Sequence, residues 1–187
     1  MIVAPASILI LGGARSGKSR YALAQAQARG GRVGVVATAE PLDREMAARI
    51  ARHRRERPAS WLTVEEPLEL VATLRRLAHS VDTVLVDCLT LWVSNHLQRG
   101  LTDESIVANA EALAKLLAER SCSVVLVSNE VGQGVHPPTA EGLRFRDLLG
   151  LVNQTVAQAV DRVVLMVAGL PLTLKDQIPH DRASEAP

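Results

Sequence analysis

Residues 7–19 read SILILGGARSGKS, and this stretch decides the fold. Its first half is an apolar run with the length of a buried strand, too short for a helix. A loop with the spacing Gly-x4-Gly-Lys-Ser follows, from Gly12 to Ser19. Glycines let backbone N–H groups converge on a polyphosphate, and the helix that starts behind the loop favours anions at its N-terminus. The stretch therefore predicts a nucleoside triphosphate site; a chance glycine-rich turn is the alternative.

The last positions of the loop have separate tasks. Lys18 is placed to reach the β- and γ-phosphates, and the Ser19 hydroxyl is placed to ligand Mg2+. The residues expected to line the triphosphate are Gly12, Gly13, Ala14, Arg15, Ser16, Gly17, Lys18 and Ser19.

The composition is that of an ordinary globular enzyme. Of the 187 residues, 48% are hydrophobic and 22% are charged, and we expect a single domain over residues 1–175 with a disordered polar tail over 176–187. Aromatic residues make up only 2% and the formal net charge is +1, which disfavours a nucleic-acid partner. Cys88 and Cys122 fall in or beside apolar runs, so no disulfide framework is expected.

The apolar N-terminus is expected to be a core strand. Pro5 interrupts it, no basic segment precedes it, and it runs directly into the phosphate loop. A signal peptide or a membrane span is therefore not expected, and the chain is interpreted as a cytoplasmic enzyme.

Further apolar runs alternate with helical patterns along the chain. Strands are expected at 33–38, 61–64, 81–87, 123–127, 163–167 and 171–175, and helices at 18–29, 43–57, 68–79, 90–97, 103–120 and 140–160. This alternation predicts an α/β fold of the P-loop NTPase (RecA-like) type, with a mostly parallel central sheet and helices on both faces. Ligands of such folds gather at the carboxyl ends of the strands, here at 12–19, 37–39, 87 and 128–130.

Asp87 ends one of these apolar strands, where the acidic metal ligand of a phosphate-loop enzyme is expected. It is a candidate to hold Mg2+ together with Ser19, directly or through water. The ordinary alternative is a strand-end aspartate that caps the following turn.

The helix expected at 43–57 is crowded with arginines, namely Arg49, Arg52, Arg54, Arg55 and Arg57. A solvated basic face, partly neutralised by glutamates at helical spacing, is the ordinary interpretation of such a run. Because this helix begins beside a strand end that should face the nucleotide, its arginines are also candidates to clamp phosphates.

His53 lies on the same helical stripe as Met46 and Ile50. Spacing alone favours a half-buried structural histidine. The neighbouring guanidinium groups point the other way, because they disfavour a positively charged imidazole and stabilise charge at a phosphorus under attack. From the residues alone, His53 is a candidate nucleophile and no more.

Several motifs together resemble one enzyme family. They are GGARSGKS at 12–19, MAARIARHRRERP at 46–58, TVEEP at 63–67, VDCLT at 86–90, SNEVG at 128–132 and FRDLLGLVNQ at 145–154. In this order they look like the bifunctional adenosylcobinamide kinase and adenosylcobinamide-phosphate guanylyltransferase, collinearly from about residue 7 to residue 175.

The resemblance implies a two-step activity that uses Mg2+ and the nucleotides GTP and ATP. The family phosphorylates the aminopropanol hydroxyl of adenosylcobinamide and then transfers GMP from GTP to that phosphate through a guanylylated histidine. His53 matches that histidine, which reverses the interpretation from spacing alone. The further positions that match nucleotide-binding residues of the family are Ala37, Thr38, Ala39, Arg54, Arg55, Glu56, Arg57, Glu65 and Asp87.

The resemblance also implies a homotrimer with the nucleotide site near a subunit boundary, and a corrinoid as the small-molecule partner. The sequence leaves the base of the kinase step open between Asp87 and Glu65. It leaves the corrinoid site open as well: residues 89–97, with Trp92, are one candidate wall, although such a run is more often a core helix.

Three other functions compete with this interpretation. A single-activity small-molecule kinase would keep the loop and leave His53 structural. A regulatory GTPase would read guanine with Asn-Lys-x-Asp, but after Asn129 this chain has Glu130 and Gly132 at the Lys and Asp positions. A nucleic-acid motor is disfavoured by the neutral charge and the few aromatic residues.

Overall fold

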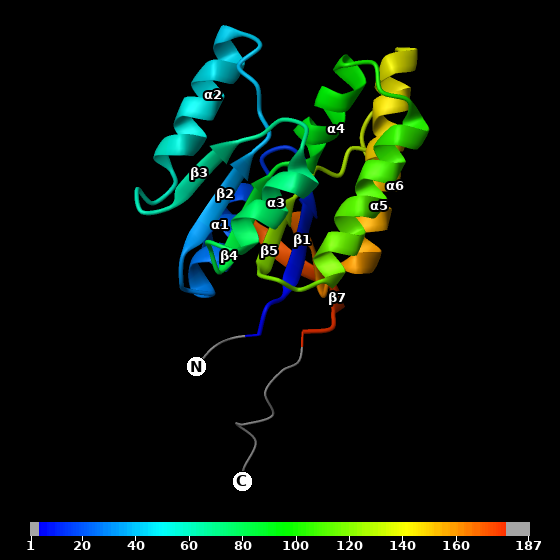
Figure 1. Ribbon diagram of the computed structural model, residues 1–187. Helices are drawn as coiled ribbons and strands as arrows, with labels where there is room; N and C mark the ends of the chain where they lie inside the picture. Colours follow the sequence, from blue (N-terminus) through cyan, green and yellow to red (C-terminus); the bar gives the residue numbers. More distant parts are fainter. Residues whose placement is uncertain (1–3, 179–187) are drawn as a thin grey trace.

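The structure is a computed structural model that describes residues 4–178 (Figure 1). The strands of this part are β1 (Ser7–Gly12), β2 (Val33–Ala37), β3 (Leu62–Glu65), β4 (Thr83–Asp87), β5 (Ser123–Val127), β6 (Arg162–Val167) and β7 (Leu170–Asp176). The helices are α1 (Lys18–Ala28), α2 (Arg44–Arg55), α3 (Leu70–Ala78), α4 (Leu89–Gln98), α5 (Asp103–Ala118) and α6 (Ala140–Ala159).

The strands form one sheet in the order β3-β2-β4-β5-β1-β6-β7. β3, β2, β4, β5, β1 and β6 are all parallel, and β7 pairs antiparallel with β6 at one edge. The mostly parallel sheet of a P-loop NTPase is thus confirmed. Because the six parallel strands end at the same edge, the loops after β1, β2 and β4 meet there.

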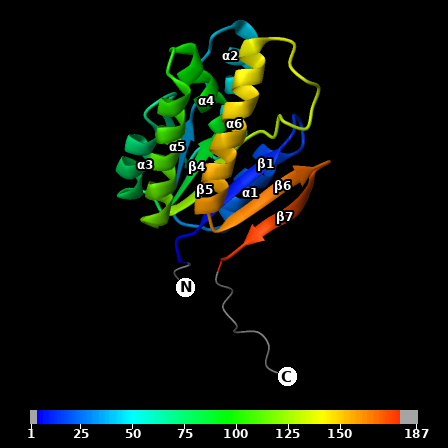
Figure 2. The same ribbon diagram turned by 90° about the vertical axis from the view of Figure 1, so that its right-hand side faces the viewer.

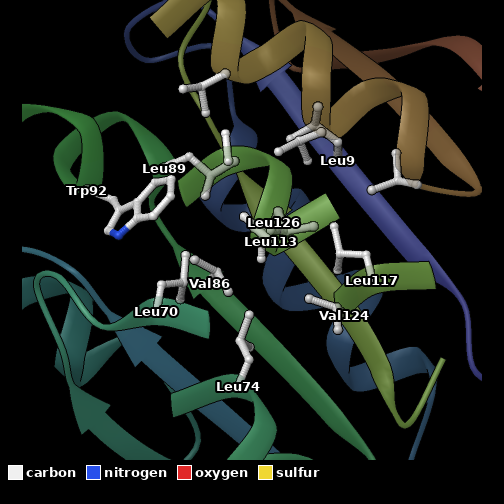
Figure 3. Close-up of a cluster of buried hydrophobic side chains, with 14 of the residues drawn as sticks. Leu9, Leu70, Leu74, Val86, Leu89, Trp92, Leu113, Leu117, Val124 and Leu126 are labelled. Atoms are coloured by element: carbon white, nitrogen blue, oxygen red, sulfur yellow. The ribbon is translucent and has the colours of Figure 1, made fainter. Parts of the chain in front are cut away.

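Helices cover both faces of the sheet, but unequally. α3, α4, α5 and α6 pack on one face, where their side chains join Leu9, Val86 and Leu126 in a buried cluster (Figures 2 and 3). α1 covers the other face, with Ala22 and Ala26, one turn apart, fully buried against the strands. Two alanines at this spacing let the helix approach the sheet closely, so that the phosphate loop leads straight from β1 into α1.

α4 belongs to the core. Trp92 is 1% exposed, and its indole N–H donates to the Leu68 carbonyl at 2.8 Å. Burying a side chain of this size contributes about 2–3 kcal/mol. The interpretation of residues 89–97 as a core helix is therefore confirmed, and Trp92 does not form an exposed wall for a ligand.

α2 stands apart from the core at the carboxyl edge (Figure 1), and none of its residues is fully buried. The Asp43 side chain caps it by accepting from the Met46 backbone N–H at 2.7 Å. The helix ends at Arg55, two residues before the expected end, since Pro58 cannot continue it. It is held by its contacts at the strand ends rather than by a core face.

One sequence expectation is wrong. The disordered tail was expected from Asp176, but β7 runs through Asp176, where Arg162 forms an ion pair with it at 2.9 Å. The Gln177 backbone N–H then donates to the Asp161 carbonyl at 2.8 Å. Pairing with β6 therefore includes Asp176, Gln177 is tied to the residue before β6, and the rest of the expected tail, 179–187, lies outside the described residues. Over residues 4–178 no helix is both long and apolar enough to span a membrane.

Candidate functional site

The phosphate loop is a strained turn that depends on glycine. Gly12 has φ +150° and Gly17 has φ +97°, and a Cβ atom at Gly12 would lie 2.6 Å from the Met166 carbonyl oxygen. Two distant segments brace the loop: the Glu130 N–H donates to the Gly12 carbonyl at 3.0 Å, and the Gly169 N–H donates to the Ser16 carbonyl at 3.0 Å. The loop shape is therefore built into the folded chain.

Lys18 is buried at the foot of this loop. Its Nζ donates to the Gly13 carbonyl at 2.6 Å, and the residue is 8% exposed. Burial lowers the pKa of Lys18; the nearby Cys88 and Asp87 act in the opposite direction, and Arg49 adds to the lowering. A buried ammonium group held in this way gains from an incoming phosphate.

The end of β2 is tied to the end of β4. The Thr38 N–H donates to the Asp87 carbonyl at 3.1 Å, and the buried Thr38 side chain contacts the backbone of Cys88. The Asp87–Cys88 peptide bond is cis. From α4, the Asn95 amide donates to the carbonyls of Thr38 at 2.7 Å and Pro67 at 3.1 Å. The expected residues Ala37, Thr38 and Ala39 are thus fixed beside Asp87.

Asp87 joins the strand ends to the arginine-rich helix. Its Oδ2 lies 3.4 Å from His53 Nδ1 and accepts from Arg57 Nη2 at 3.2 Å. The three side chains are only 18%, 20% and 9% exposed for Asp87, His53 and Arg57 respectively. Burial would raise the pKa of Asp87, but the contacts of His53 and Arg57 outweigh it and hold that pKa below its ordinary value.

A cleft lies between α2 and the strand ends. Its empty space measures about 470 Å3, open solvent included. The lining residues are Ala37, Ala39, Met46, Arg49, Ile50, His53, Arg54, Arg57, Glu65, Asp87, Cys88 and Leu91. A smaller neighbouring cavity is walled by Ser19, Glu56, His53, Arg57 and Asp87, so the phosphate-loop serine and the strand-end acid face the same space.

The structure brings most of the expected site residues together at the carboxyl edge of the sheet, but only some of them line the cavities. Arg54 is ion-paired with Glu65, which lies at the end of β3 on the rim of the cleft. Ala14, Arg15 and Arg55 are exposed and line neither cavity. Their expected contacts with a nucleotide remain predictions.

Sequence reasoning missed part of the cleft. Met46, Ile50 and Cys88 line it without having been assigned to the site. Two further lining residues had been considered: Arg49 as a candidate phosphate clamp, and Leu91 as part of the run 89–97. The helical stripe of Met46, Ile50 and His53 was visible in the sequence as a half-buried face. A partly apolar stripe on a helix with so little apolar surface is the signal that could have identified a ligand-facing side.

Comparisons with known proteins give a consistent result. The family model described as "Cobinamide kinase / cobinamide phosphate guanyltransferase" matches residues 8–174. The chain is 48% identical over 171 residues to the bifunctional adenosylcobalamin biosynthesis protein CobP of Pseudomonas aeruginosa, covering 90% of this chain and 97% of that protein. It is 37% identical over 180 residues to the protein CobU of Escherichia coli, covering 90% and 99%.

Solved structures resemble the fold alone. One ATPase domain superposes with a TM-score of 0.52 at 13% identity, covering 94% of this chain and 78% of that chain. An ATPase of a bacterial type III secretion system gives 0.57 at 15% identity, covering 90% and 56%. Both are ATPases, in keeping with the phosphate loop and the parallel sheet described above.

Proposed function

The chain belongs to the cobinamide kinase / cobinamide phosphate guanyltransferase family, and from this premise we propose how its residues divide the two activities. In the first, ATP or GTP phosphorylates the aminopropanol hydroxyl of adenosylcobinamide. In the second, GMP passes from GTP to His53 and then to the new phosphate, giving adenosylcobinamide-GDP. The observation that carries this proposal is the placement of His53 against Asp87, in a cleft beside the phosphate loop.

The phosphate loop serves the triphosphate. Its backbone N–H groups and Lys18 bind the phosphates, and Lys18 exchanges its contact with the Gly13 carbonyl for a phosphate oxygen. This contact neutralises charge on the transferred phosphoryl group. The bound oxygen positions the phosphorus for in-line attack by the corrinoid hydroxyl.

Ser19 and Asp87 would hold Mg2+ between the loop and β4. They supply the hard oxygen ligands that this ion prefers, and they wall the same small cavity. No group of three or more His, Cys, Asp or Glu residues in the described part could hold a metal ion alone. An ion shared with substrate phosphates needs only one or two protein ligands. When bound, it neutralises the phosphates and orients the leaving group.

α2 serves the nucleotidyl transfer. His53 provides a nitrogen nucleophile that divides one displacement at the α-phosphorus into two easier steps. Arg49, Arg54 and Arg57 line the same cleft and stabilise the charge that develops on the pyrophosphate and on the reacting phosphorus.

The experiment that tests this function looks for the covalent adduct. With α-labelled GTP and Mg2+ the wild-type protein should acquire an acid-labile, base-stable label, and His53→Ala should acquire none while it keeps most of its kinase activity. His79→Ala, at an exposed histidine, is the matched control and should label normally. If His53→Ala still labels, or if neither protein labels while both retain kinase activity, the chain is a single-activity kinase with a structural His53.

We also propose a homotrimer that works in the cytoplasm, where its nucleotide substrates are found. β7 is one of the two edge strands of the sheet and exposes Leu170, Leu172 and Leu174, and the adjacent Val167 of β6 is also exposed. An edge strand with this much apolar surface favours pairing with another copy of the chain.

A further inference from the structure

The two ring nitrogens of His53 have different surroundings. Nδ1 lies 3.4 Å from Asp87 Oδ2. Nε2 receives no hydrogen bond from any side chain or backbone group in residues 4–178. The ring lines both the large cleft and the small cavity next to Ser19. One nitrogen is therefore engaged by the protein, and the other is free for a ligand.

The contact with Asp87 determines where the imidazole hydrogen lies. A carboxylate accepts hydrogen bonds and has no hydrogen to donate, so the hydrogen of this contact is on Nδ1. The same oxygen also accepts from Arg57, whose guanidinium is 9% exposed. With donors on two sides, the carboxylate cannot turn away without leaving Arg57 buried and unpaired.

We propose that Asp87 is a positioning residue for guanylyl transfer: it holds His53 as the Nδ1–H tautomer, so that Nε2 is the nucleophile and GMP is carried on Nε2. This inference rests on the proposed role of His53 as the guanylylated residue. It adds which atom reacts and which side chain selects that atom. A hydrogen-bonded carboxylate is a common device for fixing the tautomer and orientation of a functional imidazole.

The step balances without an external acid or base. The Nε2 lone pair forms a bond to the α-phosphorus of GTP, and the bond from that phosphorus to the bridging oxygen breaks, with its electron pair leaving on pyrophosphate. The ring keeps its Nδ1 hydrogen and becomes a positively charged N-phosphoryl imidazolium, which the Asp87 carboxylate stabilises. When a phosphate oxygen of the corrinoid attacks the phosphorus, the Nε2–P bond breaks and its electron pair returns to the neutral ring.

This role is compatible with a metal role for the same side chain. The contacts of His53 and Arg57 both fall on Oδ2. Oδ1 makes no hydrogen bond or ion pair with the described residues, so it would be available to a Mg2+ ion held by Asp87 and Ser19, which line the same small cavity.

The test measures which ring nitrogen of His53 carries the hydrogen. In the full-length protein labelled with 15N-histidine, long-range 1H–15N spectra of the nucleotide-free enzyme in slightly alkaline buffer should show His53 as the Nδ1–H tautomer, and Asp87→Ala should shift the population toward Nε2–H. Arg75→Ala removes the exposed ion pair between Arg75 and Glu119, neither of which lines the cleft. This variant should leave the His53 signals unchanged. A wild-type His53 that is mainly Nε2–H overturns the proposal.

A second measurement uses the adduct. After reaction with GTP and Mg2+, with pyrophosphatase present, the 15N–31P coupling should appear on Nε2; coupling on Nδ1 overturns the inference while leaving the guanylyltransferase function intact. If no adduct forms, the proposed function of His53 fails, and the tautomer spectra alone then decide whether Asp87 orients the ring. Asp87→Asn should slow guanylylation more than phosphorylation of the corrinoid, whereas equal slowing of both steps indicates a metal role only and contradicts the proposal.

Discussion

The Thr38 hydroxyl closes a two-way hydrogen bond with Cys88: it donates to the Cys88 carbonyl at 2.7 Å and accepts from the Cys88 backbone N–H at 2.9 Å. The pair joins the residue after β2 to the residue after β4. It therefore fixes the backbone that carries Asp87 at the carboxyl edge of the sheet.

Thr38→Val should destabilise the protein by about 1–3 kcal/mol, because it keeps the shape but leaves the part-buried N–H of Cys88 unpaired and removes one of the two donors to the Cys88 carbonyl, which still accepts from the Trp92 N–H. Urea unfolding measures this loss. Thr63→Val on β3, whose hydroxyl makes no hydrogen bond with the described residues, should change stability by less than about 0.5 kcal/mol. Equal effects of the two substitutions would show that the Thr38 hydroxyl has no special role.

Lys18→Met should lower the rate of corrinoid phosphorylation by about 10²–10³-fold or more, because it removes a positive charge that contacts the triphosphate. The same change replaces an ammonium group that burial already disfavours, so the free energy of unfolding should stay the same or rise. Kinase assays and urea unfolding on the same preparation separate the two effects. Lys115→Met on the exposed face of α5 should alter neither quantity, and substantial kinase activity in Lys18→Met would contradict the phosphate-loop assignment.

His96 should make the protein less stable in mild acid. The residue is 4% exposed against Trp92, neither ring nitrogen has a hydrogen-bond partner among the described residues, and burial lowers its pKa. As the pH falls below about 6.5, the unfolded chain takes up a proton that the folded ring resists, so the free energy of unfolding should fall, by at most about 1.4 kcal/mol per pH unit for this group. The stability contributed by the neutral ring is thus complete above that pH and is lost below it.

The variant His96→Phe, which keeps a ring against Trp92, should show a shallower loss of stability between pH 7 and pH 5.5 than the wild type, measured by urea unfolding at several pH values. His79→Gln changes an exposed histidine and should keep the wild-type slope. An unchanged slope in His96→Phe would place the acid sensitivity elsewhere.

Cys88 should resist alkylation although it lines the cleft. Burial, and next the charge of Asp87, raise the pKa of its thiol to about 11, so at pH 8 only about one molecule in a thousand holds the reactive thiolate. Mass spectrometry after treatment with iodoacetamide should find Cys88 unmodified in the native protein and fully modified in urea. Rapid native labelling would mean that the pocket around Cys88 is more open to water than the structure shows.

The exposed leucines of β7 should support self-association. We expect the wild-type protein to have the mass of three chains by light scattering, and the double variant L170K/L172K to have the mass of one. Val135→Lys, at the most exposed large apolar residue of the 128–139 loop, is the control and should remain trimeric. A monomeric wild type would contradict the trimer, and a trimeric double variant would place its interface elsewhere.

The parts of the site that the sequence predicts best are those made by neighbouring residues. The phosphate loop is a local arrangement of glycines, a lysine and a serine, so its spacing is enough to identify it. The strand that ends at Asp87 was recognisable for the same reason. Contacts between distant segments could not be obtained in this way: Arg57 meets Asp87 across 30 positions of sequence, and only the sheet order brings them together.

α2 illustrates the remaining gap. Its periodicity shows that Met46, Ile50 and His53 share a face, but the pattern is the same whether that face meets a core or a ligand. The structure shows that it is not a core face, because no residue of α2 is fully buried and the stripe lines a cleft. The error at Asp176 has a related cause: the polar end of β7, Lys175 and Asp176, has the composition of a tail and is ordered by pairing with β6.

The brace from Gly169 to the Ser16 carbonyl has a consequence for how the protein is made. The phosphate loop leaves the ribosome before β6, which lies directly beside β1, and before the turn that holds Ser16, which is synthesised some 150 residues later. Because contacts this distant in sequence form only after the intervening chain has been ordered, a nascent chain cannot offer a finished phosphate site. Triphosphate binding is therefore a property that the growing polypeptide acquires only after β6 and the turn at Gly169 have been synthesised and have folded against the loop.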